Sequence, residues 1–378
     1  MNQDFPPFPG GISQWAYGIT NAFLEAGHSV TVYTRAKAIG DSKIHHKCRY
    51  TVIKMYGHDF NKFRMIYSSY YTIKIFLSGK FDIFIAGTWN LAFMAVFLSK
   101  FFSMKTVVVA HGWEVTREIK GIKFRELQYV FNNSTTNIAV SHFTRQHIIV
   151  KLNISEDRIK VLPNGVDLKR FHKINDFQDI QKRWQLDGKK IVLTLARIVE
   201  RKGHDIVIKA MPKVISKVPG AIYMIAGNGS NKIITDLHRL IHQLKLEDHV
   251  IFIGYVNDED LIKYYNLCDV YIMVSRVLED EGDIEGFGIS YLEANACEKP
   301  VIGGNSGGIP DAIVDGKTGF LVNPYDENEV ADTIIMLLTN PDLAQEIGKT
   351  GFHRIKQELT WQRIVEKLLP MVLDKDIL

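Results

Sequence analysis

The sequence predicts two α/β domains in tandem, each a parallel β-sheet wrapped by helices. Short runs rich in β-branched residues alternate with helical patterns along the whole chain, which is the order typical of β-α-β units. The 378 residues are enough for two cores of about 150–200 residues each. An apolar content of 46% excludes a disordered or collagen-like protein.

The expected strands number six in each half of the chain. Those of the first half are residues 28–34, 50–55, 81–86, 106–110, 136–140 and 160–162. Those of the second half are residues 190–195, 221–226, 250–253, 270–274, 300–302 and 319–322. The helical patterns that alternate with them predict parallel pairing of these strands.

The domain boundary is expected near residues 164–167, because Asn-Gly-Val-Asp is a turn signal directly after a strand. We therefore expect an N-terminal domain over residues 1–168 and a C-terminal domain over residues 169–360. Residues 361–378 predict a final amphipathic helix. Its apolar residues at helical spacing are Trp361, Ile364, Leu368 and Leu369.

The start of the chain is irregular for such a fold. A proline-rich segment ends in the Gly10-Gly11 loop before a helical pattern, but no apolar strand precedes this loop. Proline cannot donate to a sheet ladder, so the segment cannot form a central strand. The sequence predicts either that its first strand is missing or that another segment fills that position, and we favour an N-terminal truncation.

Charge is unevenly distributed between the two halves. Residues 1–172 hold 22 Lys and Arg against 11 Asp and Glu, whereas residues 173–378 hold 24 against 31. A basic half attracts anionic partners such as lipid phosphates, phospholipid surfaces or nucleic acid. No recognisable nucleic-acid-reading motif is present, so specific nucleic-acid binding is not expected.

The composition also bears on location. Three cysteines, Cys48, Cys268 and Cys297, cannot build a disulfide scaffold, which favours reduced thiols in the cytoplasm. The sequence has no apolar run of 18 residues and no features of a signal peptide. We expect a cytoplasmic protein that does not cross a membrane.

Two cations, Arg197 and Lys202, follow the strand at residues 190–195. Ligands of doubly wound sheets bind beyond the carboxyl ends of strands, where two cations can converge on one anion such as a diphosphate. The alternative is that both are surface charges at a helix start. It is disfavoured because a cation at a helix N-terminus opposes the helix dipole.

The segment that begins Glu285-Gly286-Phe287-Gly288 is the richest in chemistry. Its glycines allow backbone N–H groups to approach a ligand at the start of a helix, and Glu293 lies inside that helix. Two carboxylates so placed suit hydroxyl-rich ligands such as a sugar and a ribose, although a capped helix with an exposed glutamate gives a similar pattern. A second glycine loop, at residues 303–311, predicts another close approach of the backbone to the ligand.

Together these motifs identify the chain as similar to the family-4 retaining glycosyltransferases of the GT-B fold. The residues that carry the resemblance are Gly10-Gly11, the segment 27–32, Ala110-His111-Gly112, the segment 164–167, Arg197, Lys202-Gly203, the segment 226–229 and the pair Glu285-x7-Glu293. The resemblance implies two Rossmann-like domains facing a deep cleft, with a C-terminal helix that returns to the first domain. The chain departs from the family in three ways. Ala196 stands where the family usually has Gly, Asp311 stands where it often has Glu, and the first strand is missing.

The resemblance also implies roles for individual residues. Arg197 and Lys202 would hold the donor's diphosphate, Glu285 the transferred sugar and Glu293 the ribose, while His111 would face the sugar from the N-terminal domain. The further substrate-binding residues are Gly10, Gly11, Gly229, Tyr255, Val256, Gly286, Phe287 and Gly288. No cofactor and no metal are implied, so the acidic run at residues 258–260 is expected to be a helix start and not a metal site.

The activity implied is retaining, metal-independent transfer of a hexose from a nucleotide-sugar to a lipid-linked or saccharide acceptor, as in cell-envelope polysaccharide, lipopolysaccharide or glycolipid synthesis. The acidic residues 279–284 are similar to bacterial phosphatidylinositol-mannoside-type mannosyltransferases, which favours GDP-mannose as donor. A UDP-sugar donor and a non-catalytic nucleotide-sugar-binding subunit are the alternatives.

Two apolar stretches of the basic half suit contact with an anionic membrane. Residues 61–80 mix lysine and arginine with aromatic side chains, and residues 91–102 are almost wholly apolar. Both stretches could equally be ordinary helices packed on the first sheet. The charge of this half favours peripheral association with the inner face of the cytoplasmic membrane.

Overall fold

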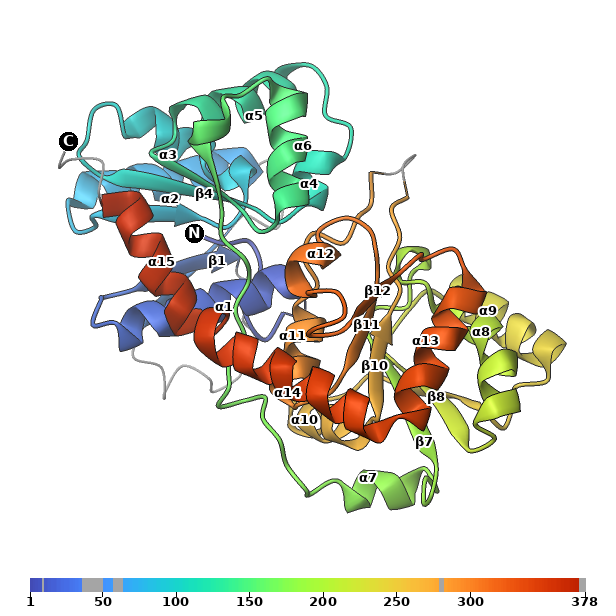
Figure 1. The fold of residues 1–378 in the computed structure, drawn as a ribbon. Coiled ribbons are helices and arrows are strands. Elements are labelled where there is room, and N and C mark those ends of the chain that lie inside the picture. Colours follow the sequence, from blue (N-terminus) through green and yellow to red (C-terminus); the bar gives the residue numbers. More distant parts are fainter. Residues whose placement is uncertain (9, 36–49, 57–63, 279–281, 374–378) are drawn as a thin grey trace. The chain divides into compact units, whose positions relative to one another are not determined.

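Three sheets of parallel strands form the framework of the residues that the computed structural model describes, which are 1–8, 10–35, 50–56, 64–278 and 282–373 (Figure 1). The chain divides into two units. The N-terminal unit comprises Met1–Gly165 together with Trp361–Leu378, and the C-terminal unit comprises Val166–Thr360. The expected C-terminal helix thus belongs to the first unit.

The C-terminal unit contains a six-stranded sheet with the order β12-β11-β10-β7-β8-β9. The strands are β7 (Lys190–Leu195), β8 (Ala221–Ala226), β9 (Val250–Gly254), β10 (Val270–Met273), β11 (Val301–Gly304) and β12 (Phe320–Val322). From β7 the chain winds outward through β8 and β9, then returns to β10 on the other side of β7. The winding direction therefore reverses between β7 and β10, where doubly wound sheets bind their ligands.

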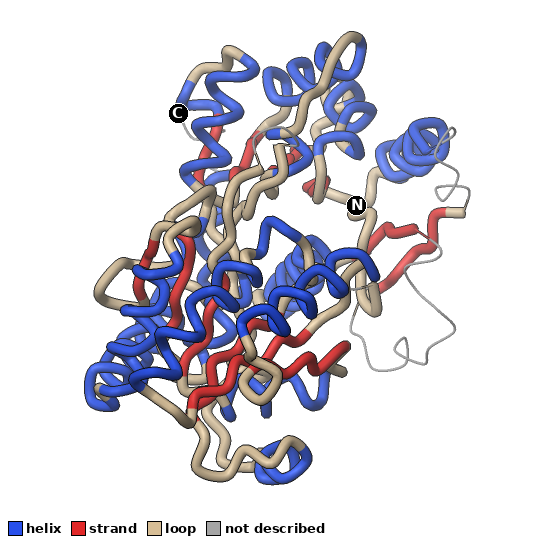
Figure 2. Tube along the Cα trace, turned by 90° about the vertical axis from the view of Figure 1, so that its right-hand side faces the viewer, coloured by secondary structure: helices blue, strands red, loops and turns tan. Residues whose placement is uncertain are grey.

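Helices cover both faces of this sheet (Figures 1 and 2). Helices α8, α9 and α13 enclose one core with the strands, α10 and α11 cover the opposite face, and α14 packs on α11 and α13. The helices are α7 (Gln178–Arg183), η5 (Glu200–Lys202), α8 (His204–Lys217), α9 (Asn231–Leu244), α10 (Asp258–Leu267), α11 (Ile289–Ala296), α12 (Ile309–Ala312), α13 (Glu327–Thr339) and α14 (Pro341–Glu358).

The N-terminal unit has a four-stranded sheet in the order β3-β4-β5-β6 and a separate pair, β1-β2. The strands are β1 (Thr31–Arg35), β2 (Thr51–Met55), β3 (Ile83–Ala86), β4 (Lys105–Ala110), β5 (Thr136–Ala139) and β6 (Ile159–Val161). The first two residues of the chain lie between the two sheets. The Asn2 N–H donates to the carbonyl of Tyr33, next to β3 the Gly87 N–H donates to the carbonyl of Met1, and both distances are 2.9 Å.

The core of the four-stranded sheet is formed with helices whose apolar faces cover it. The helices of the N-terminal unit are α1 (Gly11–Glu25), α2 (Arg64–Ser78), η3 (Trp89–Leu91), α3 (Phe93–Leu98), α4 (Trp113–Thr116), α5 (Ile122–Asn133), α6 (His142–Leu152), η4 (Glu156–Arg158) and α15 (Trp361–Leu373). All twelve expected strands are present, with ends that differ by a few residues from those expected.

Helix α15 packs on α1 through its first residue, Trp361. A methyl group at Gly18 of α1 would lie 2.1 Å from the indole Cε2, and one at Gly165 would lie 2.8 Å from its Cδ2. Both glycines therefore give the ring its space. Buried side chains continue this face of α15 at helical spacing, at Trp361, Ile364, Val365, Leu368 and Val372. Of the four residues expected on this face, Leu369 is only half-buried.

We predict that Trp361→Ala destabilises the N-terminal unit by about 3–5 kcal/mol, the usual cost of removing a buried aromatic side chain. Urea unfolding followed by circular dichroism measures the change. Glu366→Ala, an exposed position on the same helix, is the matched control and should change stability by less than about 0.5 kcal/mol. Equal unfolding midpoints for the two variants would contradict the anchoring role of the indole.

Candidate functional site

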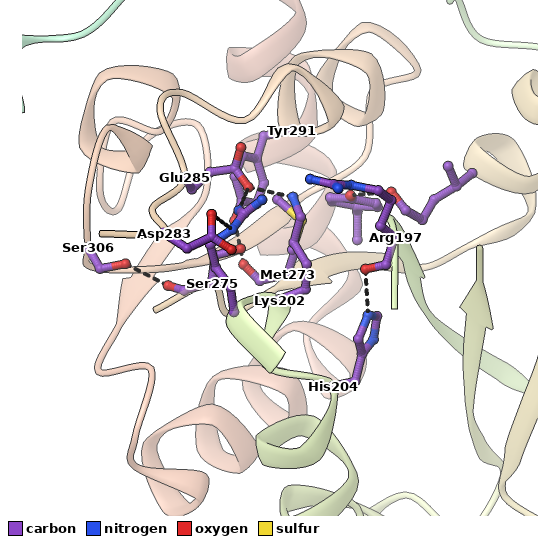
Figure 3. Close-up of polar contacts among 12 residues, drawn as sticks. Arg197, Lys202, His204, Met273, Ser275, Asp283, Glu285, Tyr291 and Ser306 are labelled. Atoms are coloured by element: carbon purple, nitrogen blue, oxygen red, sulfur yellow. Dashed lines mark hydrogen bonds and ion pairs between the residues drawn. The ribbon is translucent and has the colours of Figure 1, made fainter. Parts of the chain in front are cut away.

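A cluster of two cations and two carboxylates lies where the winding of the C-terminal sheet reverses (Figure 3). Arg201 and Lys202 come from η5, in the segment that follows β7. Asp283 and Glu285 come from the segment that follows β10 and leads to α11. The cluster exists because β7 and β10 are neighbours in the sheet although 74 residues lie between the end of β7 and the start of β10.

The cations of this cluster converge on one carboxylate. Arg201 Nη1 lies 2.7 Å from Glu285 Oε2, and Lys202 Nζ donates to the same oxygen. On its other side Arg201 Nε lies 3.0 Å from Asp283 Oδ1, while Lys202 Nζ lies 3.1 Å from the sulfur of Met273. The side chains of Arg201, Lys202 and Glu285 are only 6%, 11% and 14% exposed, so water screens these charges weakly.

The charges of the cluster shift the pKa values of its members. Burial alone would raise the pKa of the Glu285 carboxyl, but Lys202 and Arg201 together outweigh burial and hold that pKa at about 2. Burial lowers the pKa of the Lys202 amino group to about 8, and the charges of Arg201 and Arg197 add to the lowering while Glu285 opposes it. At neutral pH the pair is therefore ionised.

Arg197 extends from the end of β7 toward the amino group of Lys202 (Figure 3). Unlike Lys202 it is exposed, and within the described part of the chain no carboxylate pairs with its guanidinium. Its backbone is held in place, because the ring of His204 lies with Nε2 3.4 Å from the Arg197 carbonyl and Nδ1 3.2 Å from the Tyr223 hydroxyl. Burial lowers the pKa of His204 to about 4, so this ring is neutral.

The second carboxylate of the motif, Glu293, lies inside α11 as expected. The Tyr265 hydroxyl donates to Glu293 Oε2 at 2.6 Å. Burial raises the pKa of the Glu293 carboxyl, although this hydrogen bond acts against the rise. Tyr265 therefore orients a carboxylate that the sequence placed on the helix without a partner.

The glycines of the predicted ligand loops lie in close contact with other atoms of the protein. A methyl group at Gly288 would lie 2.5 Å from the ring of Tyr291, and one at Gly229 would lie 2.4 Å from the carbonyl oxygen of Ile198. Gly288 also caps α11 at a φ of 95°, which favours glycine. Both glycines are thus needed for the fold of the site itself. Gly286 and Phe287, which lie between Glu285 and Gly288, are buried.

The glycine loop at residues 303–311 contacts the backbone of Glu285. The Gly308 N–H donates to the Glu285 carbonyl at 2.8 Å, and a methyl group at Gly307 would lie 2.6 Å from the same oxygen. The Ser306 hydroxyl donates to the Ser275 carbonyl at 2.6 Å (Figure 3). The loop therefore packs closely against the segment after β10, and its approach to a ligand stays a prediction.

The remaining expected site residues lie further along the sheet or in the other unit. Tyr255 and Val256 follow β9, and the Tyr255 side chain is 69% exposed whereas Val256 is buried. Gly10 caps α1 at a φ of 126°, and Gly11 begins that helix. A methyl group at Gly10 would have no described atom within 4 Å, so its conformation and not its surroundings favours glycine there.

His111 follows β4 in the N-terminal unit and is half-buried. Burial lowers the pKa of its imidazole to about 4, although a hydrogen bond with the backbone of Gly87 acts in the other direction. Its ring packs edge-on against Trp15 with centroids 5.2 Å apart, and Nε2 has no hydrogen-bond partner among the described residues. His111 is therefore neutral at physiological pH, and its Nε2 remains available for a hydrogen bond to a ligand.

Other expectations have definite outcomes. Residues 258–260 form the first turn of α10, where the Asn257 side chain accepts from the Asp260 N–H, so the expected helix start is confirmed. Cys268 and Cys297 are buried free thiols, and Cys48 lies outside the described residues. None of the helices described is both long and apolar enough to cross a bilayer.

Sequence reasoning missed four side chains that shape the site: Arg201, His204, Tyr265 and Asp283. Arg201 adjoins Lys202, and Asp283 is separated from Glu285 by one residue, so each lies beside a residue that was identified. The signal available in the sequence was that a second cation lies beside Lys202 and a second acid lies near Glu285. Only the strand order shows that the two pairs meet.

Comparisons with known proteins agree with this geometry. Residues 9–170 match the model "Glycosyltransferase Family 4", and residues 176–354 match "Glycosyl transferases group 1". The GDP-mannose-dependent alpha-(1-6)-phosphatidylinositol monomannoside mannosyltransferase of Mycolicibacterium smegmatis is 29% identical over 96% of this chain and 94% of its own length. The enzyme of the same name from Mycobacterium tuberculosis is 32% identical over 70% and 68%.

The fold also matches solved structures. Anabaena HepE, crystallised in complex with UDP, superposes with a TM-score of 0.79 at 18% identity, and the match covers 97% of both chains. The two parallel-sheet units define a glycosyltransferase of the GT-B class. The chain belongs to the glycosyltransferase family that the family-4 and group-1 models describe.

We predict that Glu285→Gln changes how stability depends on pH. The folded-state pKa of Glu285 is below the ordinary value of 4.5, so its ion pairs stabilise the fold above that value and are lost as the pH falls toward 2. The difference in unfolding free energy between wild type and variant should therefore shrink between pH 5 and pH 2. Urea unfolding at several pH values measures it, and a difference that stays constant over this range would contradict the assigned ion pairs.

Proposed function

We propose that this chain is a retaining, metal-independent hexosyltransferase that moves mannose from GDP-mannose to a lipid-linked or saccharide acceptor in cell-envelope glycan or glycolipid synthesis. The observation that carries the proposal is the cationic group of Arg197 and Lys202 beside the carboxylate of Glu285, at the point where the winding of the sheet reverses. An anion-binding group next to a sugar-binding group is what a nucleoside-diphosphate sugar requires.

The diphosphate would be held by Lys202 and Arg197. Lys202 is charged at neutral pH, and the N-terminus of α11 adds backbone N–H groups that favour an anion. Glu285 would accept hydrogen bonds from the hexose and Glu293 from the ribose. Two protein cations would neutralise the diphosphate in the way that a metal ion does in other enzymes, which is why we propose metal independence.

In the transfer step the bond between the sugar C1 and the diphosphate oxygen breaks, and its electron pair leaves with the phosphate. The acceptor hydroxyl attacks C1 from the same face, and its proton passes to the departing phosphate oxygen. The configuration at C1 is then retained with no protein nucleophile. Well-placed donors such as Lys202 stabilise the developing phosphate charge, each by roughly 3–4 kcal/mol.

His111 would serve the sugar as a neutral hydrogen-bonding group. Its low pKa excludes a permanent imidazolium at physiological pH, and its unpaired Nε2 suits a hydroxyl group. Gly10 and Gly11 at the start of α1 would approach the donor or acceptor with backbone N–H groups. The ring of Tyr255 is exposed next to β9 and would stack on the nucleobase, with Val256 beneath.

The donor has two candidates. GDP-mannose is supported by the mycobacterial relatives named above, whose names specify that donor. The acidic segment that suggested the same donor lies partly outside the described residues, because residues 279–281 are not described. A UDP-sugar is the second candidate, and the HepE complex with UDP favours it.

We also propose that the N-terminal unit contacts an anionic membrane surface through α2 and α3. One face of α2 is buried, but its other face exposes Ile66, Tyr67, Tyr70, Ile73 and Leu77 beside Lys74. Helix α3, which contacts α2, and the turn after it expose Phe97, Phe101 and Phe102. Apolar and aromatic side chains next to cations are typical of helices that lie in the lipid interface. Residues 61–63 of the predicted stretch lie outside the described residues.

We predict that Lys202→Ala loses most turnover and remains folded. A panel of GDP- and UDP-sugars, scored by donor hydrolysis, identifies the donor with wild-type protein, and the same assay then measures the variant. Removal of one charge-assisted donor should lower kcat by roughly a hundredfold or more, and Lys202→Arg should recover part of it. A Lys202→Ala variant with unchanged kcat would contradict the assigned site, and a wild type without activity on any donor would contradict the proposed function.

We predict that replacing Ile66, Ile73 and Leu77 by Gln weakens binding to phosphatidylglycerol vesicles at low salt. Each side chain is exposed on α2, so the fold should tolerate the change. The control replaces by Gln the residues Ile122 and Val150, which are at least as exposed as the three test residues and lie on α5 and α6 of the same unit. Flotation measures binding. Wild type that does not float with these vesicles, or control and test variants that behave alike, would exclude this surface.

A further inference from the structure

We propose that Arg201 is a positioning residue for the carboxylate of Glu285 and that Asp283 holds Arg201 in place for this task. The inference rests on the proposed function, because it takes Glu285 to be the group that meets the transferred hexose. It adds two residues, Arg201 and Asp283, to which neither the sequence motif nor the proposed reaction gave a role.

The contacts of Arg201 fix it at both ends. Its guanidinium lies between two carboxylates: Nη1 donates a hydrogen bond to Glu285 Oε2 at 2.7 Å, and Nε forms an ion pair with Asp283 Oδ1 at 3.0 Å that is not aligned as a hydrogen bond. Its backbone carbonyl accepts the Arg276 N–H at 2.9 Å. Arg276 is itself buried and donates through Nη1 to both carboxylate oxygens of Asp205, at 3.0 and 3.1 Å. A planar guanidinium held in this way orients whatever it binds.

The same contacts leave one oxygen of Glu285 for a ligand. Arg201 and Lys202 both contact Oε2, and in the described part of the chain no hydrogen bond or ion pair reaches Oε1. A hexose hydroxyl can therefore donate to Oε1 while the cations keep their positions. The carbonyl of Glu285 is fixed separately by the Gly308 N–H, so the residue is held by both its backbone and its side chain.

Arg201 and Lys202 then have different tasks. Lys202 lies on the side of Arg197, where the diphosphate would bind, so part of its interaction with Glu285 gives way to phosphate when the donor arrives (Figure 3). Arg201 lies on the side of Asp283 and is almost fully buried, so it does not reach the phosphate and keeps its contact with Glu285. Without Arg201, Glu285 would follow Lys202 toward the diphosphate and lose its orientation to the sugar.

This division of tasks predicts a split between sugar-dependent and phosphate-dependent binding. Loss of Arg201 should weaken interactions that involve the hexose and leave the affinity for the bare nucleoside diphosphate within about twofold of wild type. A role in stability alone would lower both affinities together or neither. The split is therefore the measurement that separates positioning from structural support.

The experiment compares wild type, Arg201→Met, Arg201→Lys and Asp283→Asn. Calorimetry gives the dissociation constants of GDP and GDP-mannose, and in parallel those of UDP and UDP-glucose, while donor hydrolysis gives kcat and KM. We expect Arg201→Met to lose roughly ten- to hundredfold in kcat/KM, the usual cost of a hydrogen bond to a charged group. Arg201→Lys keeps the positive charge but lacks the planar set of N–H donors of the guanidinium, so its kcat/KM should fall nearly as much.

Two controls complete the design. Arg239→Met removes the same side chain from an exposed pair with Asp236 on α9, and it should match wild type. Asp283→Asn should show the same split as Arg201→Met, and the double variant should lose less than the product of the two single losses because both act on one contact. Circular dichroism shows whether each variant is folded. If Arg201→Met does not fold, Arg201→Lys is the milder variant that tests the same contact.

The outcomes separate the two proposals. An active wild type together with an Arg201→Met variant of equal kcat/KM, or one that loses GDP and GDP-mannose affinity by the same factor, would overturn the positioning role and leave the proposed function standing. A wild type that binds neither nucleotide and hydrolyses neither sugar donor would overturn the proposed function and this inference with it.

Discussion

The convergence of two buried cations on one carboxylate is the interaction on which the site depends. Removing charged groups from water costs several kcal/mol per ion, and this cost is recovered only if the geometry is good and the remaining hydrogen bonds are made. In this protein Glu285 has two cationic partners and Arg201 has two anionic ones. An apolar cluster of the same size could stabilise the fold equally well. We therefore infer that the role of this network is to place charged groups beside the position where a charged ligand binds.

The network is precise because the loops that carry it are in backbone contact. Glycine is required where these loops meet: a methyl group at Gly203 would lie 2.3 Å from the carbonyl of Val274, and one at Gly227 would lie 1.9 Å from that of Ala196. The segments after β7, β8, β10 and β11 thus form one packed layer at the carboxyl end of the sheet. A rigid support of this kind is what keeps catalytic groups within the tolerance that chemistry needs.

The sequence was enough to predict the strands from local patterns and, through the resemblance to a known family, the GT-B class. Periodicity identifies strands, and Lys202, Glu285 and Glu293 belong to motifs with fixed spacing. The partners of these residues are a different matter. Arg201 meets Asp283, and Tyr265 meets Glu293, only because distant strands and helices are adjacent in the fold, and no local pattern contains that information. The exposed apolar face of α2 was equally undecidable, since an amphipathic pattern gives the two faces of a helix but not what covers the second.

The most direct test of this account is a crystal structure of the protein with bound GDP. The account predicts that the diphosphate lies within hydrogen-bond distance of Lys202 Nζ and the Arg197 guanidinium, with Arg201 still bound to Asp283 and Glu285. A diphosphate bound elsewhere in the C-terminal unit, away from both Lys202 and Arg197, would contradict it.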